Sequence, residues 1–241
     1  MNKFAILSIY TKNILPLAVV TTEYNKRKYC EKHNYDLIVQ TNNFTYKDIG
    51  FAKIDFVLKT LKTNKYDWIY WCGCDTMITN YDITLESMID DNYEFIISYD
   101  VWDFNSDSFL IKNSSQAIKY FEHILSLYNE YIDDTGKPID HGLKLPDGGA
   151  RAWAEQGAMI DLYHKYTEYK NIIKPMNQKF MNSYLYHLYP SPWHQRALDC
   201  KGNPGSWSEG DFLVHWPGMN NDNRINLALN FLQHVKGDLD N

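Results

Sequence analysis

The run Trp68–Cys72 is the segment that most restricts the fold of this chain. Its residues, WIYWC, are apolar or aromatic on both alternating faces. A strand of this kind is typical of the centre of a sheet that helices cover on each side. The run stops at Gly73, and Asp75 follows. Because ligands gather at the carboxyl ends of strands in open α/β sheets, we expect Asp75 to lie where chemistry takes place.

The rest of the N-terminal half alternates strand-like and helix-like segments. The short apolar runs predict strands at residues 4–8, 36–40, 95–98 and 108–111. Apolar residues at helical spacing predict helices over residues 16–34 and 52–61, and a further helix that Asn113 or Ser114 caps. This alternation is that of an α/β domain with a mainly parallel central sheet flanked by helices.

The C-terminal half contains two irregular segments, residues 133–151 and 189–210, both rich in Gly, Pro or Asp. The first is long enough to be a candidate lid or acceptor loop. The remaining segments predict a helix over residues 153–166, a strand at 212–214 and a closing helix over 227–235. No repeat or low-complexity segment marks a boundary, so we expect one domain over residues 1–241.

Composition limits the class of protein. The 241 residues are 44% apolar, which is enough for a substantial core. The net charge of −6 argues against a nucleic-acid partner, because the longest basic stretch is residues 26–28. The 19 Tyr and 7 Trp suit a sugar-binding cleft, although an AT-rich genome would explain the same enrichment.

The start of the chain and its cysteines bear on location. The apolar run after residue 3 is too short for a signal peptide or a transmembrane segment. We therefore expect a soluble, cytoplasmic protein whose four cysteines are reduced thiols. Cys72 and Cys74 lack a second pair at zinc-site spacing, which disfavours a structural zinc.

Residues 66–80, which include Trp68–Cys72 and Asp75, resemble the Asp-x-Asp segment of GT-A glycosyltransferases. They are most similar to the family of fungal galactosyl- and mannosyltransferases and plant xyloglucan xylosyltransferases. Five further segments resemble that family in the same order, so that the resemblance spans about residues 1–220: they are residues 28–37, 51–54, 105–114, 154–158 and 210–218. The order of the segments makes coincidence a poor explanation.

The resemblance implies a GT-A, Rossmann-like single domain. Residues 1–112 would be the nucleotide-sugar-binding half, and residues 113–241 would hold the acceptor and the strand with a metal-binding histidine. Mn, or Mg, would be bound by Asp75 and His215. Gln156 or Glu155 would stabilise the oxocarbenium-like state beneath the sugar. The implied donor-binding residues are Ser8, Tyr10, Thr11, Lys53, Asp75, Thr76, Asn105 and Gly218.

Two positions depart from the family pattern. Gly73 stands where the first Asp of Asp-x-Asp would be, which removes one carboxylate from the expected metal site. Asn220 stands where the plant enzymes carry a Lys, which removes a cation that could contact the diphosphate. Without the resemblance, Asp75 could simply cap a turn, His215 could be a hydrogen-bonded core histidine, and Lys53 could be a surface charge.

The function that follows is transfer of a hexose or pentose from a nucleotide-sugar, with a UDP-sugar favoured, to a saccharide acceptor with retention of configuration. An inverting enzyme would instead need a carboxylate base, and Asp107, Asp147 or Asp211 could serve. A sugar-nucleotide or glycan-binding protein without turnover is the second alternative, because of Gly73. A glycoside hydrolase is disfavoured, since no pair of carboxylates can be assigned as acid and nucleophile.

Overall fold

The computed structural model describes residues 2–141, 153–189 and 196–238. A six-stranded sheet lies at its centre, in the order β2-β1-β3-β6-β5-β7. β1 pairs in parallel with β2 and β3, β6 is antiparallel to β3 and β5, and β5 is parallel to β7. The predicted mainly parallel sheet is therefore confirmed. The strands are β1 (Phe4–Ile9), β2 (Asp36–Gln40), β3 (Trp68–Cys72), β5 (Phe95–Asp100), β6 (Asp103–Lys112) and β7 (Ile173–Met176).

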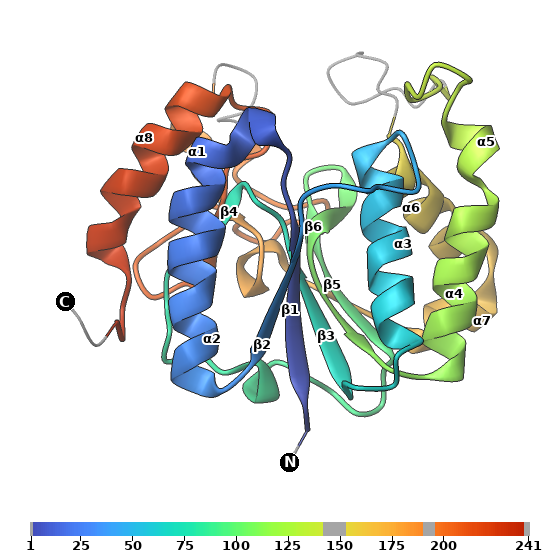
Figure 1. The fold of residues 1–241 in the computed structure, drawn as a ribbon, viewed down its shortest axis with the longest axis horizontal. Coiled ribbons are helices and arrows are strands. Elements are labelled where there is room, and N and C mark those ends of the chain that lie inside the picture. The colour runs from blue at the N-terminus through green and yellow to red at the C-terminus, as the bar shows by residue number, and fades with distance from the viewer. Residues whose placement is uncertain (1, 142–152, 190–195, 239–241) are drawn as a thin grey trace.

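Helices cover both faces of this sheet (Figure 1). One face carries α1 (Leu15–Ala18), a π-helical stretch (Val19–Lys26), α2 (Arg27–His33) and α8 (Asn221–Phe231). The other face carries α3 (Ile49–Leu61), α4 (Ser115–Ser126), α5 (Tyr128–Tyr131), α6 (Glu155–Lys165) and α7 (Thr167–Ile172). β3 is buried along its whole length, as its sequence predicts. Its side chains alternate between two cores, with Ile69 and Trp71 in one and Tyr70 in the other.

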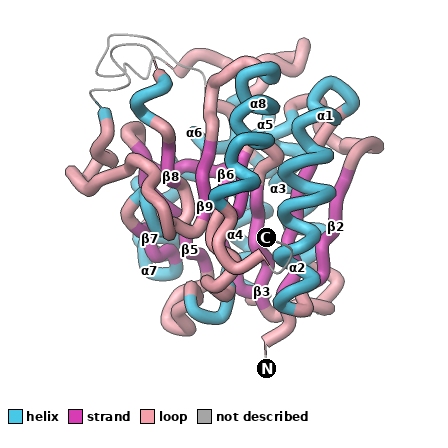
Figure 2. The backbone as a smooth tube through the Cα atoms, turned by 90° about the vertical axis from the view of Figure 1, so that its left-hand side faces the viewer, coloured by secondary structure: helices cyan, strands magenta, loops and turns pink. Residues whose placement is uncertain are grey.

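A second, three-stranded sheet lies beside α8, in the order β4-β9-β8 (Figure 2). Its strands are β4 (Thr76–Ile78), β8 (Ser183–Tyr184) and β9 (Leu213–His215). β4 follows directly after the turn that holds Asp75, and it pairs with β9 so that Thr76 lies opposite His215. This pairing brings the two residues predicted to bind a metal together, although they are far apart in the sequence.

Side-chain caps explain where several helices begin. Ser114 accepts a hydrogen bond from the N–H of Ala117, which confirms the predicted cap of α4. Asp48 caps α3, so that this helix begins before residue 52, where the apolar spacing alone placed its start. Asn220 caps α8 in the same way, and that helix also begins earlier than the predicted residue 227.

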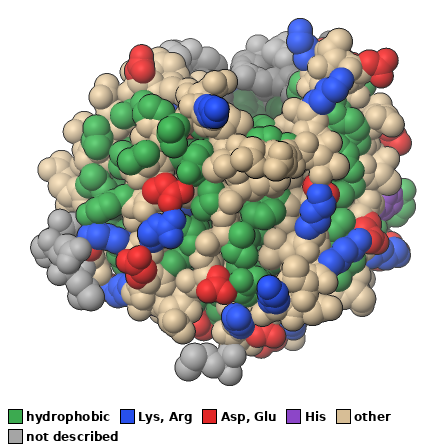
Figure 3. Space-filling view, viewed as in Figure 1, with side chains coloured by type: hydrophobic (Ala, Val, Ile, Leu, Met, Phe, Trp, Pro, Cys, Tyr) green, Lys and Arg blue, Asp and Glu red, His purple; other side chains and the backbone are tan. Residues whose placement is uncertain are grey.

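Charged groups are spread over the surface. On the face seen in Figure 3, acidic and basic side chains lie interspersed among apolar ones. All four cysteines are free thiols, as expected. Within the described residues, no helix combines the length and the apolar character that crossing a bilayer requires.

Candidate active site

A pocket of about 470 Å³ lies at the edge of the sheet where β1, β3 and β5 end and β6 begins. This volume is in the range of small-molecule sites. Its wall includes the ends of those strands together with parts of α3, α6 and α8. The pocket therefore lies where the sequence predicts Asp75 to be, at the carboxyl end of a central strand.

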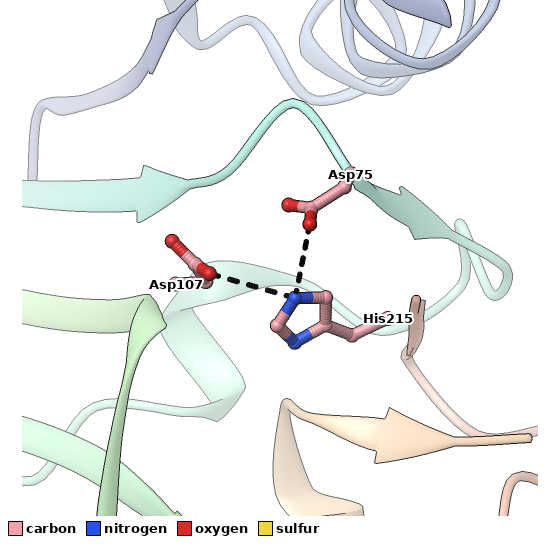
Figure 4. Close-up of side chains that lie close together, drawn as sticks. All are labelled: Asp75, Asp107 and His215. Carbon is pink, nitrogen blue, oxygen red and sulfur yellow. Dashed lines mark ion pairs between the residues drawn. The ribbon is translucent and has the colours of Figure 1, made fainter. Parts of the chain in front are cut away.

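Three side chains from three elements converge beside the pocket (Figure 4). Asp75 follows β3, Asp107 lies in β6 and His215 ends β9. Nε2 of His215 is 3.5 Å from Oδ2 of Asp75 and 3.5 Å from Oδ2 of Asp107. One ligand atom from each residue lies within 4.8 Å of the other two. Two carboxylates and an imidazole are a donor set that suits Mn and related divalent ions.

The ring of His215 is held in a fixed orientation. Its Nδ1 lies 2.7 Å from Oδ1 of Asn182, an acceptor, so Nδ1 carries a hydrogen. In the neutral ring, Nε2 then has a free lone pair, which is the form that binds a metal. Nε2 is buried, and no described residue forms a hydrogen bond with it. In this neutral form, a cation would complement the lone pair aimed between two carboxylates, so these residues fit a divalent metal ion.

Electrostatics keep one of the two acids ionised. Burial alone would raise the pKa of Asp75, but His215, when its ring is protonated, and Arg224 outweigh burial and hold that pKa well below its usual range. Arg224, on α8, lies 2.8 Å from Oδ2 of Asp75, and its Nε donates to the carbonyl of Trp216. The pKa of Asp107 is raised instead, first by burial and also by repulsion from Asp75, against the opposing effect of Lys53.

Asp107 was not predicted from the sequence to be a metal ligand, only a possible base. It lies opposite Gly73, whose N–H donates to its carbonyl at 2.9 Å. A Cβ at residue 73 would lie 3.3 Å from Oδ1 of Asp107, so this carboxylate occupies the space beside the missing side chain. The sequence carried no direct signal for this role, because it depends on strand pairing: β6 is antiparallel to β3, with Ser108 opposite Cys72, so that Asp107 adjoins the end of β3.

A buried ion pair lines the pocket. Nζ of Lys53 lies 2.6 Å from Glu155 and 3.6 Å from Asp107, and it also donates to Ser106. Lys53 is 4% exposed, which excludes the alternative that it is a solvated surface charge. Although burial acts to raise the pKa of Glu155, its pairing with Lys53 and its hydrogen bonds lower it overall. Glu155 is therefore ionised, and its charge is balanced within the protein.

Gln156 lines the same pocket from the first turn of α6. Its Oε1 accepts from the N–H of Ser106 at 3.2 Å. The Ser106 hydroxyl has one hydrogen, and its shorter contact, 2.7 Å, is to Glu155. Oε1 of Gln156 therefore keeps a lone pair while the backbone of β6 fixes the amide in place.

Part of the chain matches a known family. Residues 15–92 match the galactosyl transferase GMA12/MNN10 family. The family match agrees with the resemblance found in the sequence. No curated protein matches the chain by sequence.

Solved structures extend the comparison to nearly the whole chain. A glycosyltransferase involved in glycosylating the major capsid of PBCV-1 is 15% identical, with 94% of this chain and 98% of that one covered and a TM-score of 0.65. The chain has the GT-A glycosyltransferase fold. GlyE of Streptococcus pneumoniae TIGR4 is also similar: it is 12% identical, 98% of this chain and 65% of that chain are covered, and the TM-score is 0.55. The galactosyltransferase LgtC is 12% identical, with 96% of this chain and 95% of that chain covered and a TM-score of 0.51. Family match and fold together support a glycosyltransferase.

Within this GT-A fold, the residues predicted to bind the donor do not all line the described pocket. Asp75, Lys53 and Asn105 line it. At the β1 end, its described walls are formed by Ile9, with Ile14 and Leu17 beside it. The other predicted donor residues lie outside the described lining: these are Ser8, Tyr10, Thr11, Thr76 and Gly218.

The structure gives each of these residues a local setting. Ser8 is buried inside β1, and the hydroxyl of Tyr10 donates to Glu23 at 2.9 Å. Thr76 donates to the carbonyl of Gly73, which shapes the turn around Asp75. Gly218 has φ of +69°, a conformation that favours glycine. Their roles in donor binding remain predictions.

The candidate bases of an inverting enzyme are also placed. Asp107 belongs to the metal-binding cluster described above. Asp211 accepts from Ser183 and pairs with Lys179, and it is not among the described residues that line the pocket. Asp147 lies outside the described residues.

Proposed function

We propose that this chain is a metal-dependent glycosyltransferase that moves a hexose or pentose from a nucleotide-sugar to a saccharide acceptor with retention of configuration. A UDP-sugar is the favoured donor. The observation that carries the proposal is the buried Nε2 of His215, which points between Asp75 and Asp107 and has no hydrogen-bond partner among the described residues. A site built for a cation beside a pocket suits the transfer of a group from a diphosphate.

Asp75, Asp107 and His215 would hold the metal ion, with Mn favoured over Mg because one donor is an imidazole. When bound, such an ion neutralises the charge that develops on the departing diphosphate. Asn182 contributes by keeping Nε2 of His215 directed at the site.

Arg224 is the side chain best placed to add positive charge for the diphosphate. It lines the pocket beside Asp75, and it reaches there from α8, whereas the family position occupied by Asn220 is one turn away as the cap of that helix. Both side chains are paired, Arg224 with Asp75 and Lys53 with Glu155, but Asp75 would be bound by the metal ion, whereas Lys53 stays held by Glu155 and Ser106. We therefore assign contact with the diphosphate to Arg224 and assign Lys53 the role of holding Glu155 and Ser106 in place.

Retention is supported by Gln156 more than by Glu155. In a retaining transfer, the leaving phosphate can accept the acceptor proton on the same face of the sugar, and the protein stabilises the positive charge near C1. Gln156 lines the pocket and its Oε1 accepts only from Ser106 among the described residues, while the charge of Glu155 is balanced by Lys53. One similar solved structure is an active-site mutant of LgtC in which a glutamine is replaced by glutamate (11% identity, TM-score 0.52).

The direct test is a panel of UDP- and GDP-sugars incubated with the purified protein, with and without Mn. We expect slow hydrolysis of at least one donor, and faster turnover with a saccharide acceptor, only when Mn is present. Asp75→Asn and His215→Gln should both abolish it. The NMR coupling constant of the product's anomeric proton reports retention or inversion. A protein that binds a donor but turns over none would instead be a binding protein without activity.

A further inference from the structure

The order of strands along the sheet edge gives the pocket two ends. β1, β3, β6 and β5 follow one another, and residues at the pocket edge of each line it. With neighbouring strands about 4.8 Å apart, the β1 end and the β5 end are separated by roughly 14 Å. The metal-binding cluster lies between them, since Asp75 follows β3 and Asp107 belongs to β6.

The end beside β5 is aromatic. Trp102 and Trp153 both line the pocket there, and each is half-buried. Their ring centroids are 6.3 Å apart and their planes meet at 58°, so the two indoles form a corner. The guanidinium of Arg196 lies 4.3 Å from the centroid of the Trp102 ring.

Trp102 is held in position by a tight turn between β5 and β6. Asp100 accepts a hydrogen bond from the N–H of Trp102 at 2.7 Å. Asp103 has φ of +119°, a conformation that non-glycine residues rarely adopt, and its carboxylate contacts His164 at 2.7 Å. Such a conformation persists only where the surrounding structure enforces it, and it is concentrated at functional sites.

The same turn is connected to the metal-binding cluster. Oδ2 of Asp100 accepts from the hydroxyl of Tyr184 at 2.8 Å and from Asn105 at 3.1 Å. The ring of Tyr184 in turn packs 5.3 Å from that of His215, centroid to centroid. The aromatic corner and the cluster are therefore parts of one packed wall.

We propose that Trp102 and Trp153 form the acceptor subsite, in which a pyranose ring of the acceptor stacks on the indole of Trp102 and abuts Trp153. This inference rests on the proposed function, which places the donor diphosphate at the cluster. The nucleotide then extends towards Ile9 at the β1 end, and the acceptor approaches from the β5 end. Indole faces suit this ligand because their negative π-surface attracts the C–H groups of a sugar ring.

The test measures binding of saccharides directly. Saturation-transfer NMR is recorded with methyl glucoside, galactoside, mannoside and xyloside and with lactose, cellobiose and maltose, in the presence of UDP and of Mg, which is diamagnetic. We expect at least one sugar to bind the wild type, and Trp102→Ala and Trp153→Ala to weaken that binding by about ten-fold, with Trp102→Phe in between. The matched control is Trp207→Phe, since Trp207 packs on Phe231 and His234 outside the described lining and should change nothing.

The outcomes separate this inference from the proposed function. If the wild type turns over a donor but Trp102→Ala keeps its acceptor KM within about two-fold, the acceptor subsite is wrong and the transferase stands. If no donor is turned over but a sugar binds in a Trp102-dependent way, the transferase is wrong and the saccharide subsite stands. If no sugar of the panel binds the wild type, the subsite is overturned. The Mn-induced rise in Tm shows whether each variant keeps its metal site.

Discussion

Gly73 and Asp107 lie opposite each other, at the point where β3 ends beside the middle of β6. The N–H of Gly73 donates to the carbonyl of Asp107 at 2.9 Å, and a Cβ on Gly73 would lie 3.3 Å from Oδ1 of Asp107. The carboxylate that the Asp-x-Asp pattern would place at residue 73 is thus replaced in space by one from the neighbouring strand. If a carboxylate at either residue can bind the same metal ion, an Asp at residue 73 should be able to replace Asp107.

Exchanging the two residues tests this relationship. Asp107→Gly alone should weaken Mn binding by more than about ten-fold, because loss of even an outer partner of a metal ligand costs that much. Gly73→Asp combined with Asp107→Gly should restore most of the affinity. The backbone permits the change, since Gly73 is not among the glycines with positive φ. EPR of free Mn during titration measures the affinity of each variant.

Gly73→Asp alone provides the control for crowding. Its Cβ would meet Oδ1 of both Asp75 and Asp107 at 3.3 Å, so three carboxylates would share one space. Equal Mn affinity in the wild type and in Asp107→Gly would show that Asp107 is not a ligand.

The central strands and most helices could be predicted because local sequence determines them. Strands β1 and β3 are apolar runs that are buried along their whole length, and such strands can be recognised directly in the sequence. β2 is only partly buried, but its three central apolar residues were enough to predict it. Asp75 could be found for the same reason, because it follows a recognisable strand. His215 was found through the resemblance alone.

The remaining parts of the site depend on pairings between distant segments. β4 and β8 are three and two residues long, too short to show a periodic pattern. Asp107 becomes a neighbour of Asp75 only because β6 is antiparallel to β3. Arg224 belongs to a helix, and so contacts Asp75, only because α8 begins at residue 221 rather than near 227. The position of Trp102 is set by the hairpin turn between β5 and β6, which the predicted strands at 95–98 and 108–111 do not reach.

Asn182 should tune metal binding without touching the metal. Its Oδ1 fixes Nδ1 of His215 at 2.7 Å, and removing such a partner typically lowers metal affinity by about 10–100-fold. We therefore expect Asn182→Ala to weaken Mn binding to this extent in the same EPR titration. Asn230→Ala, on an exposed position of α8, is the matched control. An Asn182→Ala variant with wild-type affinity would mean that packing alone orients the ring.

Arg224 should weaken the binding of Mn and strengthen the binding of UDP. Its guanidinium lies 2.8 Å from Asp75 and competes there with a metal ion. Arg224→Met should thus tighten binding of Mn alone, while weakening binding of UDP in the presence of Mn by about ten-fold through loss of a charge-assisted hydrogen bond. Isothermal titration calorimetry measures both. Arg27→Met, which removes a surface partner of Glu23, should alter neither. A variant that loses both affinities would assign Arg224 a purely structural role.

Removing one partner of the ion pair between Lys53 and Glu155 should destabilise the protein more than removing both. Lys53→Met leaves a buried carboxylate without its cation, and breaking a buried pair in this way costs about 3–5 kcal/mol. Replacing both partners removes the unpaired charge, so Lys53→Met with Glu155→Gln should lose much less stability than Lys53→Met alone. Urea unfolding followed by fluorescence measures the three free energies of unfolding.

A lysine on the same helix gives the comparison. Lys59 pairs with Asp55 at 2.7 Å, but its side chain is 61% exposed, so Lys59→Met should cost no more than about 1 kcal/mol. If Lys53→Met costs as little as Lys59→Met, Glu155 must find water or another partner once Lys53 is gone. Glu155 would then be free to face the sugar, and the preference for Gln156 as the group beneath C1 would have to be reversed.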